Sequence, residues 1–134
     1  MKTMFQPGRR VSGLVAGVAL FAAGATLAQA PGIKRTILQR SDVGGNMEVI
    51  LGAAEIAAGG ATGRHTHFGV ETGYVLSGTS LLEIEGEAPR NLKAGDSYTI
   101  PAGKVHNATA KDGEAKVLAT YVVEKGKPLA TPAP

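Results

Sequence analysis

Apolar and polar residues alternate over several short stretches of this chain, and glycine- or proline-containing segments separate these stretches. A period of two is typical of half-buried β-strands, and no window of adequate length has the period of an amphipathic helix. Many short strands with turns between them predict an all-β sandwich or barrel. The predicted strands are residues 47–57, 71–76, 79–85, 97–100, 105–110 and 115–123.

Ser77 and Gly78 are the only residues between the predicted strands at 71–76 and 79–85. A two-residue connection that contains glycine is the commonest link between neighbouring antiparallel strands. We therefore expect these two strands to pair with each other as a β-hairpin.

The N-terminal part of the chain, residues 1–30, has a composition of its own. Its first ten residues include three basic ones and no acidic one, and residues 11–27 form an uncharged apolar run. Ala28-Gln29-Ala30 then fits a small-x-small cleavage site. This three-part layout predicts a secretory signal peptide over residues 1–30. The apolar run is shorter than the roughly 20 residues of a membrane-spanning helix. We therefore expect cleavage after Ala30 rather than retention as an anchor.

Two export routes fit this segment. Arg9-Arg10 could belong to a twin-arginine signal, which exports folded proteins. The Phe-Leu pair that usually follows such arginines is missing, so general secretion is favoured. Either route predicts a periplasmic or secreted protein, for which the membrane is a partner only through the signal peptide.

Removing residues 1–30 changes the charge balance. The whole chain has 14 Lys and Arg against 11 Asp and Glu, and three of the basic residues lie in the predicted signal peptide. The remainder is neutral, which argues against nucleic acid as a partner. The chain has no cysteine, so histidine, carboxylate and amide are the strong metal ligands that it offers.

The chain has three histidines, of which His65 and His67 are separated by one residue. Residues i and i+2 of a strand share a face, so both imidazoles can reach one cation. Glu71 opens the next strand, from which its carboxylate could approach the same ion. His106 follows the rigid turn at residues 101–103. Taken singly, each of these residues is more often a surface or core residue than a ligand.

Together, three neutral imidazoles and one carboxylate suit a divalent transition metal such as Fe, Mn, Co, Ni, Cu or Zn. Four protein ligands leave two positions of an octahedral ion open for water, a substrate or dioxygen. If the chain brings these residues to one place, they form a metal site with open coordination positions; otherwise they are unrelated polar residues.

These residues resemble the two motifs of the cupin superfamily. The first motif is matched by Gly59, His65, His67, Glu71 and Gly78. The second is matched by Gly95, Pro101, Gly103 and His106, and its last position, usually Asn, is Ala110. The missing Asn is not a metal ligand in the family, so the resemblance implies an intact metal site.

The resemblance implies a single-domain double-stranded β-helix, or jelly-roll barrel, with the metal held by His65, His67, Glu71 and His106. Fold does not define function, and two hypotheses stay open. The first is a metal-dependent oxygenase or related small-molecule enzyme, in which Glu71 also acts as a general base. The second is a non-catalytic periplasmic protein that binds a small molecule or buffers metal.

Three further residues are candidates for the pocket. Phe68 follows the second ligand, and we expect it to cover the metal or line the barrel mouth, with packing in the core as the alternative. Tyr98 and Ile100 share a face by alternation, and the resemblance makes that face the barrel interior. Tyr98 is then a candidate pocket hydroxyl, with a position at the rim as the alternative.

The resemblance also predicts how the chain is organised into segments. We expect residues 31–46 to form an N-terminal edge segment, residues 47–124 the barrel domain, and residues 125–134 a flexible, solvated tail without a core-forming pattern. Small cupins often form dimers by extending a sheet, and residues 33–40 are the candidate edge-pairing strand of a homodimer.

Overall fold

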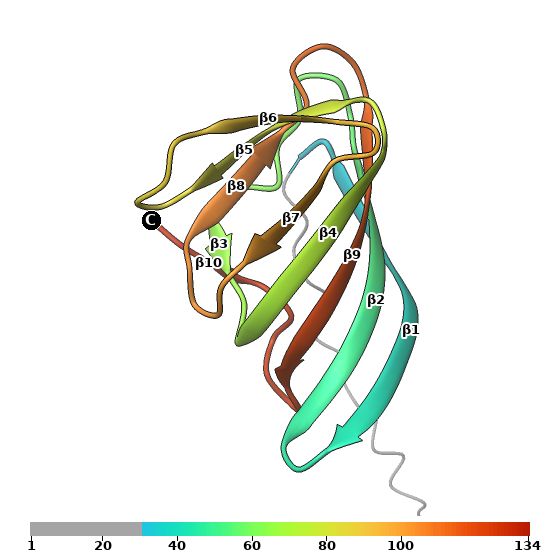
Figure 1. Cartoon of the computed structure of the whole chain (residues 1–134), viewed down its shortest axis with the longest axis vertical. Helices are drawn as coiled ribbons and strands as arrows, with labels where there is room; N and C mark the ends of the chain where they lie inside the picture. The colour runs from blue at the N-terminus through green and yellow to red at the C-terminus, as the bar shows by residue number, and fades with distance from the viewer. Residues whose placement is uncertain (1–30) are drawn as a thin grey trace, which may run out of the picture.

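A computed structural model describes residues 31–134 of the chain, and the predicted signal peptide lies outside the described residues. The described part contains ten β-strands and no helix (Figure 1). Accordingly, residues 31–134 include no helix with the length and apolar character needed to cross a membrane.

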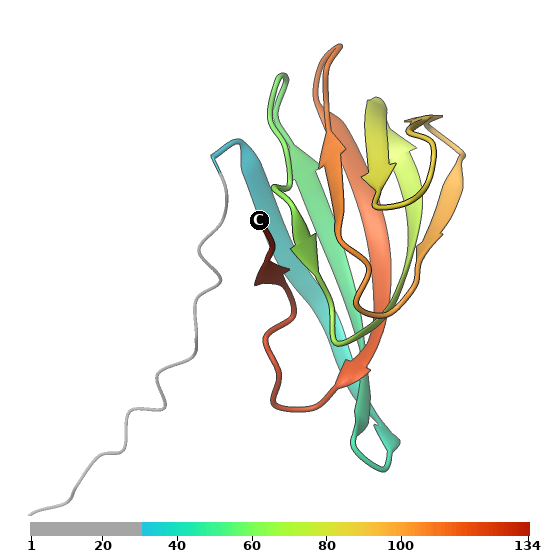
Figure 2. The same cartoon turned by 90° about the vertical axis from the view of Figure 1, so that its left-hand side faces the viewer.

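The strands form two five-stranded antiparallel sheets that face each other (Figure 2). The first sheet has the order β1 (Ile33–Gly44), β2 (Met47–Ile56), β9 (Ala115–Glu124), β4 (Gly69–Ser77) and β7 (Ser97–Ile100). The second has the order β10 (Thr131–Pro132), β3 (His65–Thr66), β8 (His106–Thr109), β5 (Thr79–Ile84) and β6 (Arg90–Lys93). This arrangement confirms the predicted all-β jelly-roll barrel.

Strict alternation places the core between the sheets. In β4 and β9 every second residue is buried, and the residues between them are exposed or half-buried. Val75 and Ile100 are among the largest fully buried side chains, at 0% and 1% exposure. Burying each such side chain contributes about 1.5–3 kcal/mol. The alternation in the sequence is therefore the direct cause of the two-layer fold.

The predicted hairpin between β4 and β5 is wrong. β4 pairs with β9 and β7, whereas β5 pairs with β6 and β8 in the other sheet. The chain changes sheets at Gly78, which has a φ of +76°. A Cβ atom on Gly78 would lie 2.1 Å from the carbonyl oxygen of Glu114. The turn at Gly78 therefore packs closely against the segment that precedes β9. The local sequence gives no sign of this contact.

The expectation of a solvated tail over residues 125–134 is also wrong. Leu129 is buried and packs in a core cluster with Ile50 and Tyr121. After it, β10 pairs with β3, so that the chain end lies beside the first ligand strand (Figures 1 and 2). A single buried leucine and a two-residue strand are too short to produce a periodic pattern, which explains why the sequence indicated a tail.

The N-terminal segment forms β1, which pairs only with β2 and therefore makes one edge of the first sheet. Ile33 is buried, and Arg35 is on the same side of the strand by alternation. The register shifts between Ile37 and Gln39, after which the strand is exposed. The first residues of β1 thus close the barrel, and the last residues of β1 extend beyond the core.

Candidate metal centre

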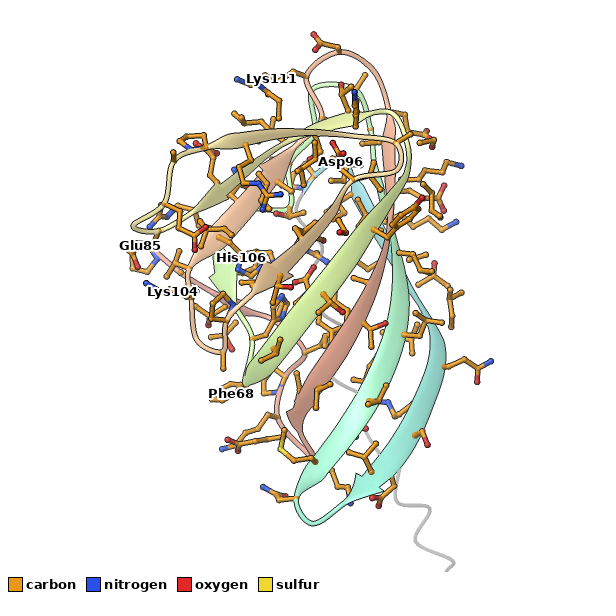
Figure 3. All side chains as sticks on the ribbon, viewed as in Figure 1. Phe68, Glu85, Asp96, Lys104, His106 and Lys111 are labelled. Atoms are coloured by element: carbon orange, nitrogen blue, oxygen red, sulfur yellow. The ribbon has the colours of Figure 1, made fainter. Side chains whose placement is uncertain are left out.

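The fold brings four side chains to one place. One ligand atom from each of His65, His67, Glu71 and His106 lies within 4.8 Å of the others, and all four residues are buried. His65 on β3 is directly paired with His106 on β8, and His67 follows β3 by one residue. Glu71 comes from β4 in the opposite sheet. Figure 3 shows His106 on β8, on the side facing the first sheet.

Each imidazole is oriented by the backbone through its Nδ1 atom. The three Nδ1 atoms face carbonyl oxygens: His65 that of Gly63 at 2.7 Å, His106 that of Lys104 at 2.9 Å, and His67 that of Leu129. A carbonyl oxygen only accepts, so each Nδ1 carries the proton. In the neutral ring the lone pair is then on Nε2, which is the arrangement that metal-binding histidines use.

The Nε2 atoms surround the Glu71 carboxylate. Nε2 of His67 lies 2.8 Å from Glu71 Oε2, and Nε2 of His106 lies 3.4 Å from the same oxygen. Both Nε2 atoms are buried and have no hydrogen-bond partner. Lone pairs on nitrogen and a carboxylate repel each other unless a proton or a metal ion lies between them. These residues therefore fit a divalent transition metal, which would be bound by three nitrogens and one oxygen.

The charge on Glu71 is maintained by its surroundings. Burial by itself would raise the pKa of this carboxyl. With a proton between the Glu71 oxygen and the rings of His106 and His67, these contacts and the Tyr98 hydroxyl outweigh burial and hold the pKa well below its usual range. The Tyr98 hydroxyl donates a 2.7 Å hydrogen bond to Glu71 Oε1. Burial and the Glu71 charge raise the pKa of Tyr98, so it remains a protonated donor. Tyr98 thus orients the carboxylate from the side opposite the imidazoles.

His65 is neutral over a wide pH range. Burial, followed by the neighbouring His106, lowers the pKa of His65 to about 4. Metal binding requires an unprotonated imidazole, so burial keeps this ring in the form that binds an ion.

A cavity of about 30 Å³ adjoins the cluster. A single water needs at least about 10–15 Å³, so the cavity has room for little more than two waters. Its polar side is formed by His65, His106, Glu71, Tyr98, Tyr121, Arg35 and Thr62. Its apolar side is formed by Ala54, Ile56, Leu82, Ala108, Val117 and Ala119.

Of the three predicted pocket residues, only Tyr98 lines this cavity. Ile100 is 1% exposed and packs in the core cluster with Val75. Phe68 is 41% exposed, with Lys127 Nζ 5.3 Å from its ring centroid, and Figure 3 shows it beside the start of β4. Phe68 is therefore neither a core aromatic nor part of the wall of this cavity.

Sequence reasoning missed Arg35 and Tyr121, which both line the cavity. Tyr121 alternates with the buried residues of β9 and stacks edge-on against His67, with ring centroids 4.9 Å apart. That alternation was a signal for Tyr121. Arg35 had no comparable signal, because alternation in β1 is lost after a few residues.

Replacing Leu129 by alanine should destabilise the protein and weaken metal binding. The loss of a buried leucine costs about 2–4 kcal/mol. The same change loosens the segment whose carbonyl accepts from His67 Nδ1, and loss of such a support typically weakens metal binding about 10–100-fold. Thermal unfolding and metal titration measure the two effects.

The matched control for Leu129→Ala is Lys127→Ala, an exposed residue in the same segment. It should change stability by less than about 0.5 kcal/mol. If both variants behave like the unmodified protein, residues 125–134 do not support the site.

The fold and the site define a small jelly-roll barrel with a buried three-histidine, one-glutamate cluster that could hold a metal ion. The chain belongs to the cupin family, since the family profile of the cupin domain matches residues 52–124. This match confirms the resemblance seen in the two sequence motifs.

Solved structures with the same fold include several enzymes. KdgF from Halomonas sp. is 26% identical, with a TM-score of 0.59, over 71% of this chain and 83% of that one. DMSP lyase DddQ from Ruegeria pomeroyi DSS-3 is 20% identical, with a TM-score of 0.65, over 75% of this chain and 51% of that one. The polyketide cyclase RemF from Streptomyces resistomycificus is 21% identical, with a TM-score of 0.60, over 74% and 70%. No curated protein sequence matches the chain.

Proposed function

We propose that this cupin is a metal-dependent enzyme that acts on a small molecule. The proposal depends on one observation: three imidazoles are held by backbone carbonyls so that their Nε2 atoms converge beside Glu71, next to a cavity. A site used only for structure has no need of that adjoining space. Several proteins of the same fold, among them a DMSP lyase and a polyketide cyclase, are enzymes.

A divalent ion in this site would supply Lewis-acid chemistry, polarising a substrate oxygen or a water. The protein's own residues would do the rest. Tyr98 holds Glu71 Oε1 and leaves Oε2 directed at the imidazoles, so Glu71 is placed to take up a proton as a general base. The apolar wall of the cavity, which includes Leu82 and Val117, limits the access of bulk water.

A non-catalytic role in small-molecule binding or metal buffering is the second candidate. It is favoured by the size of the cavity, which at about 30 Å³ admits only a very small ligand. Only the enzyme function requires that the protein converts a substrate, so turnover distinguishes the two functions.

Metal analysis and turnover assays distinguish these functions. We expect the purified protein to contain close to one equivalent of a transition metal per chain. Loaded protein should convert at least one member of a panel of very small organic molecules, including short organic acids, with oxygen consumption measured in parallel. Glu71→Gln should abolish that turnover. Absence of metal after loading contradicts both functions, whereas loaded protein without turnover supports the buffering role.

We also propose that the chain is exported, on the basis of the three-part pattern of residues 1–30. The mature protein should then begin at Pro31. N-terminal sequencing of protein from the extracytoplasmic fraction measures this directly. Recovery of soluble extracytoplasmic protein that begins at Met1 would contradict the proposal.

A homodimer formed through β1 is a further part of the proposal. β1 is an edge strand whose Ile37 and Leu38 side chains are 45% and 46% exposed, and exposed edges tend to pair with another chain. Light scattering at tens of micromolar should give the mass of two chains. The double variant Ile37→Lys/Leu38→Lys should be monomeric, and a monomeric unmodified protein would exclude this dimer.

A further inference from the structure

Arg35 brings a positive charge to the candidate metal centre. It lies near the start of β1, and its side chain lines the same cavity as His65, Glu71 and His106. Its Nη2 donates a 3.3 Å hydrogen bond to the carbonyl oxygen of Thr62, which lines the cavity too. An arginine from the edge strand therefore reaches inward to the centre of the barrel.

The guanidinium interacts electrostatically with the site. Its burial lowers the pKa of Arg35, while the nearby Tyr121 and Glu71 raise it. In turn, Arg35 is one of the groups that lower the pKa of His65. An arginine keeps its proton in proteins, so the cavity contains a permanent positive charge.

Charge counting with a bound ion shows which ligand the site favours. The divalent ion contributes two positive charges and Arg35 one, while Glu71 contributes one negative charge and the three histidines are neutral. The loaded site has an excess of positive charge in a largely enclosed space. Buried charge is stable when it is paired, so the site favours an anionic ligand over a neutral one.

We propose that the cavity binds a small carboxylate, whose carboxylate group accepts hydrogen bonds from Arg35 beside the metal position. The inference rests on the proposed function, since it assumes that the four ligands hold a divalent ion. A planar guanidinium matches the two oxygens of a carboxylate. The alanine, valine and leucine side chains that also line the cavity suit a short apolar body, and the volume of about 30 Å³ restricts the ligand to a very short acid.

The test compares acetate with acetamide, which has the same shape and no charge. Protein loaded with Co²⁺ is titrated with each probe, and binding is followed by the visible absorption of the ion and by calorimetry. The variants are Arg35→Met and Arg35→Lys. The control is Arg90→Met, an exposed arginine that donates to the carbonyl oxygen of Ser97 and does not line the cavity.

We expect acetate to bind more tightly than acetamide to the unmodified protein. Arg35→Met should weaken acetate binding roughly 10–100-fold, the effect of losing a charge-assisted pair. Arg35→Lys should recover part of the loss, because it restores the charge without the planar fork. Acetamide binding should change little in either variant, and Arg90→Met should bind both probes normally.

The outcomes separate this inference from the proposed function. If Arg35→Met binds Co²⁺ normally and acetate with unchanged affinity, the carboxylate inference fails and the metal site stands. If the unmodified protein binds no Co²⁺, the proposed function fails first. If Arg35→Met does not fold, the comparison of Arg35→Lys with the unmodified protein still decides. An equal loss of acetate and acetamide binding would show a structural role for Arg35 and overturn the inference.

Discussion

Replacing His106 by alanine should abolish the stabilisation that a transition metal gives to this protein. An ion that binds only the folded state stabilises it by about 2.7 kcal/mol at a hundredfold excess over the dissociation constant. For a domain of this size that corresponds to roughly 10–20 °C in melting temperature. His106 comes from β8, far along the chain from the other three ligands, so its removal tests whether the two motifs converge on one ion.

The measurement is the melting temperature with excess Zn²⁺ minus the melting temperature with a chelator, for each variant. Taking this difference removes any effect of the substitution on the metal-free fold. Asn107→Ala is the matched control, because the Asn107 side chain bonds to Glu83, Thr62 and Thr109 and is not in the ligand cluster. It should keep most of the stabilisation. Unchanged metal affinity in His106→Ala would refute the proposed site.

The melting temperature of the metal-loaded protein should fall steeply as the pH drops from about 6 to 4.5. An unfolded histidine has a pKa of about 6.5, whereas a metal-bound histidine must stay neutral. Below pH 6.5 the unfolded chain therefore takes up protons that the loaded native state excludes, and each such proton costs about 1.4 kcal/mol per pH unit. With three histidine ligands, protons displace the ion over this narrow range.

The metal-free protein should lose stability in the same direction with a shallower slope. Burial lowers the pKa of His65 to about 4, so this ring contributes stability at neutral pH that is lost between about pH 6.5 and 4. The pKa of Glu71 is held below its usual range, so its contribution is lost only at lower pH. Parallel curves for loaded and metal-free protein, recorded by calorimetry at several pH values, would contradict metal binding by these histidines.

The positions of the longer strands in the sequence were predictable because the alternation of apolar and polar residues is a local pattern. Each of the six predicted strands corresponds to an observed one within a few residues. A strand with alternating apolar and polar residues can bury its apolar face in only one way. Pairing between strands was not predictable in the same way. The Ser77-Gly78 turn was expected to fold β5 back on β4, but the backbone contact between Gly78 and Glu114 belongs to a turn that crosses to the other sheet.

The spacing of the His-x-His pair and of the following Glu indicated a metal site, and the resemblance to the two cupin motifs identified all four residues, including the distant His106, as one set. The surroundings of the site had no such signature. The carbonyl that accepts from His67 belongs to Leu129, in a segment whose sequence indicated a tail. Arg35 reaches the cavity beside the cluster from the edge strand β1, at the other end of the described chain.

The sequence by itself determined most of the strands, the jelly-roll class and the histidine and glutamate cluster, because these follow from short-range periodicity and from the resemblance of two motifs. Only the tertiary structure decided what surrounds the cluster. Tyr98, Tyr121 and Arg35 line one cavity, whereas Phe68, adjacent to a ligand in the chain, is exposed and does not line it. The physical reason is that packing between the two sheets brings together residues that face each other across the barrel. The number of residues between them in the sequence says nothing about that distance.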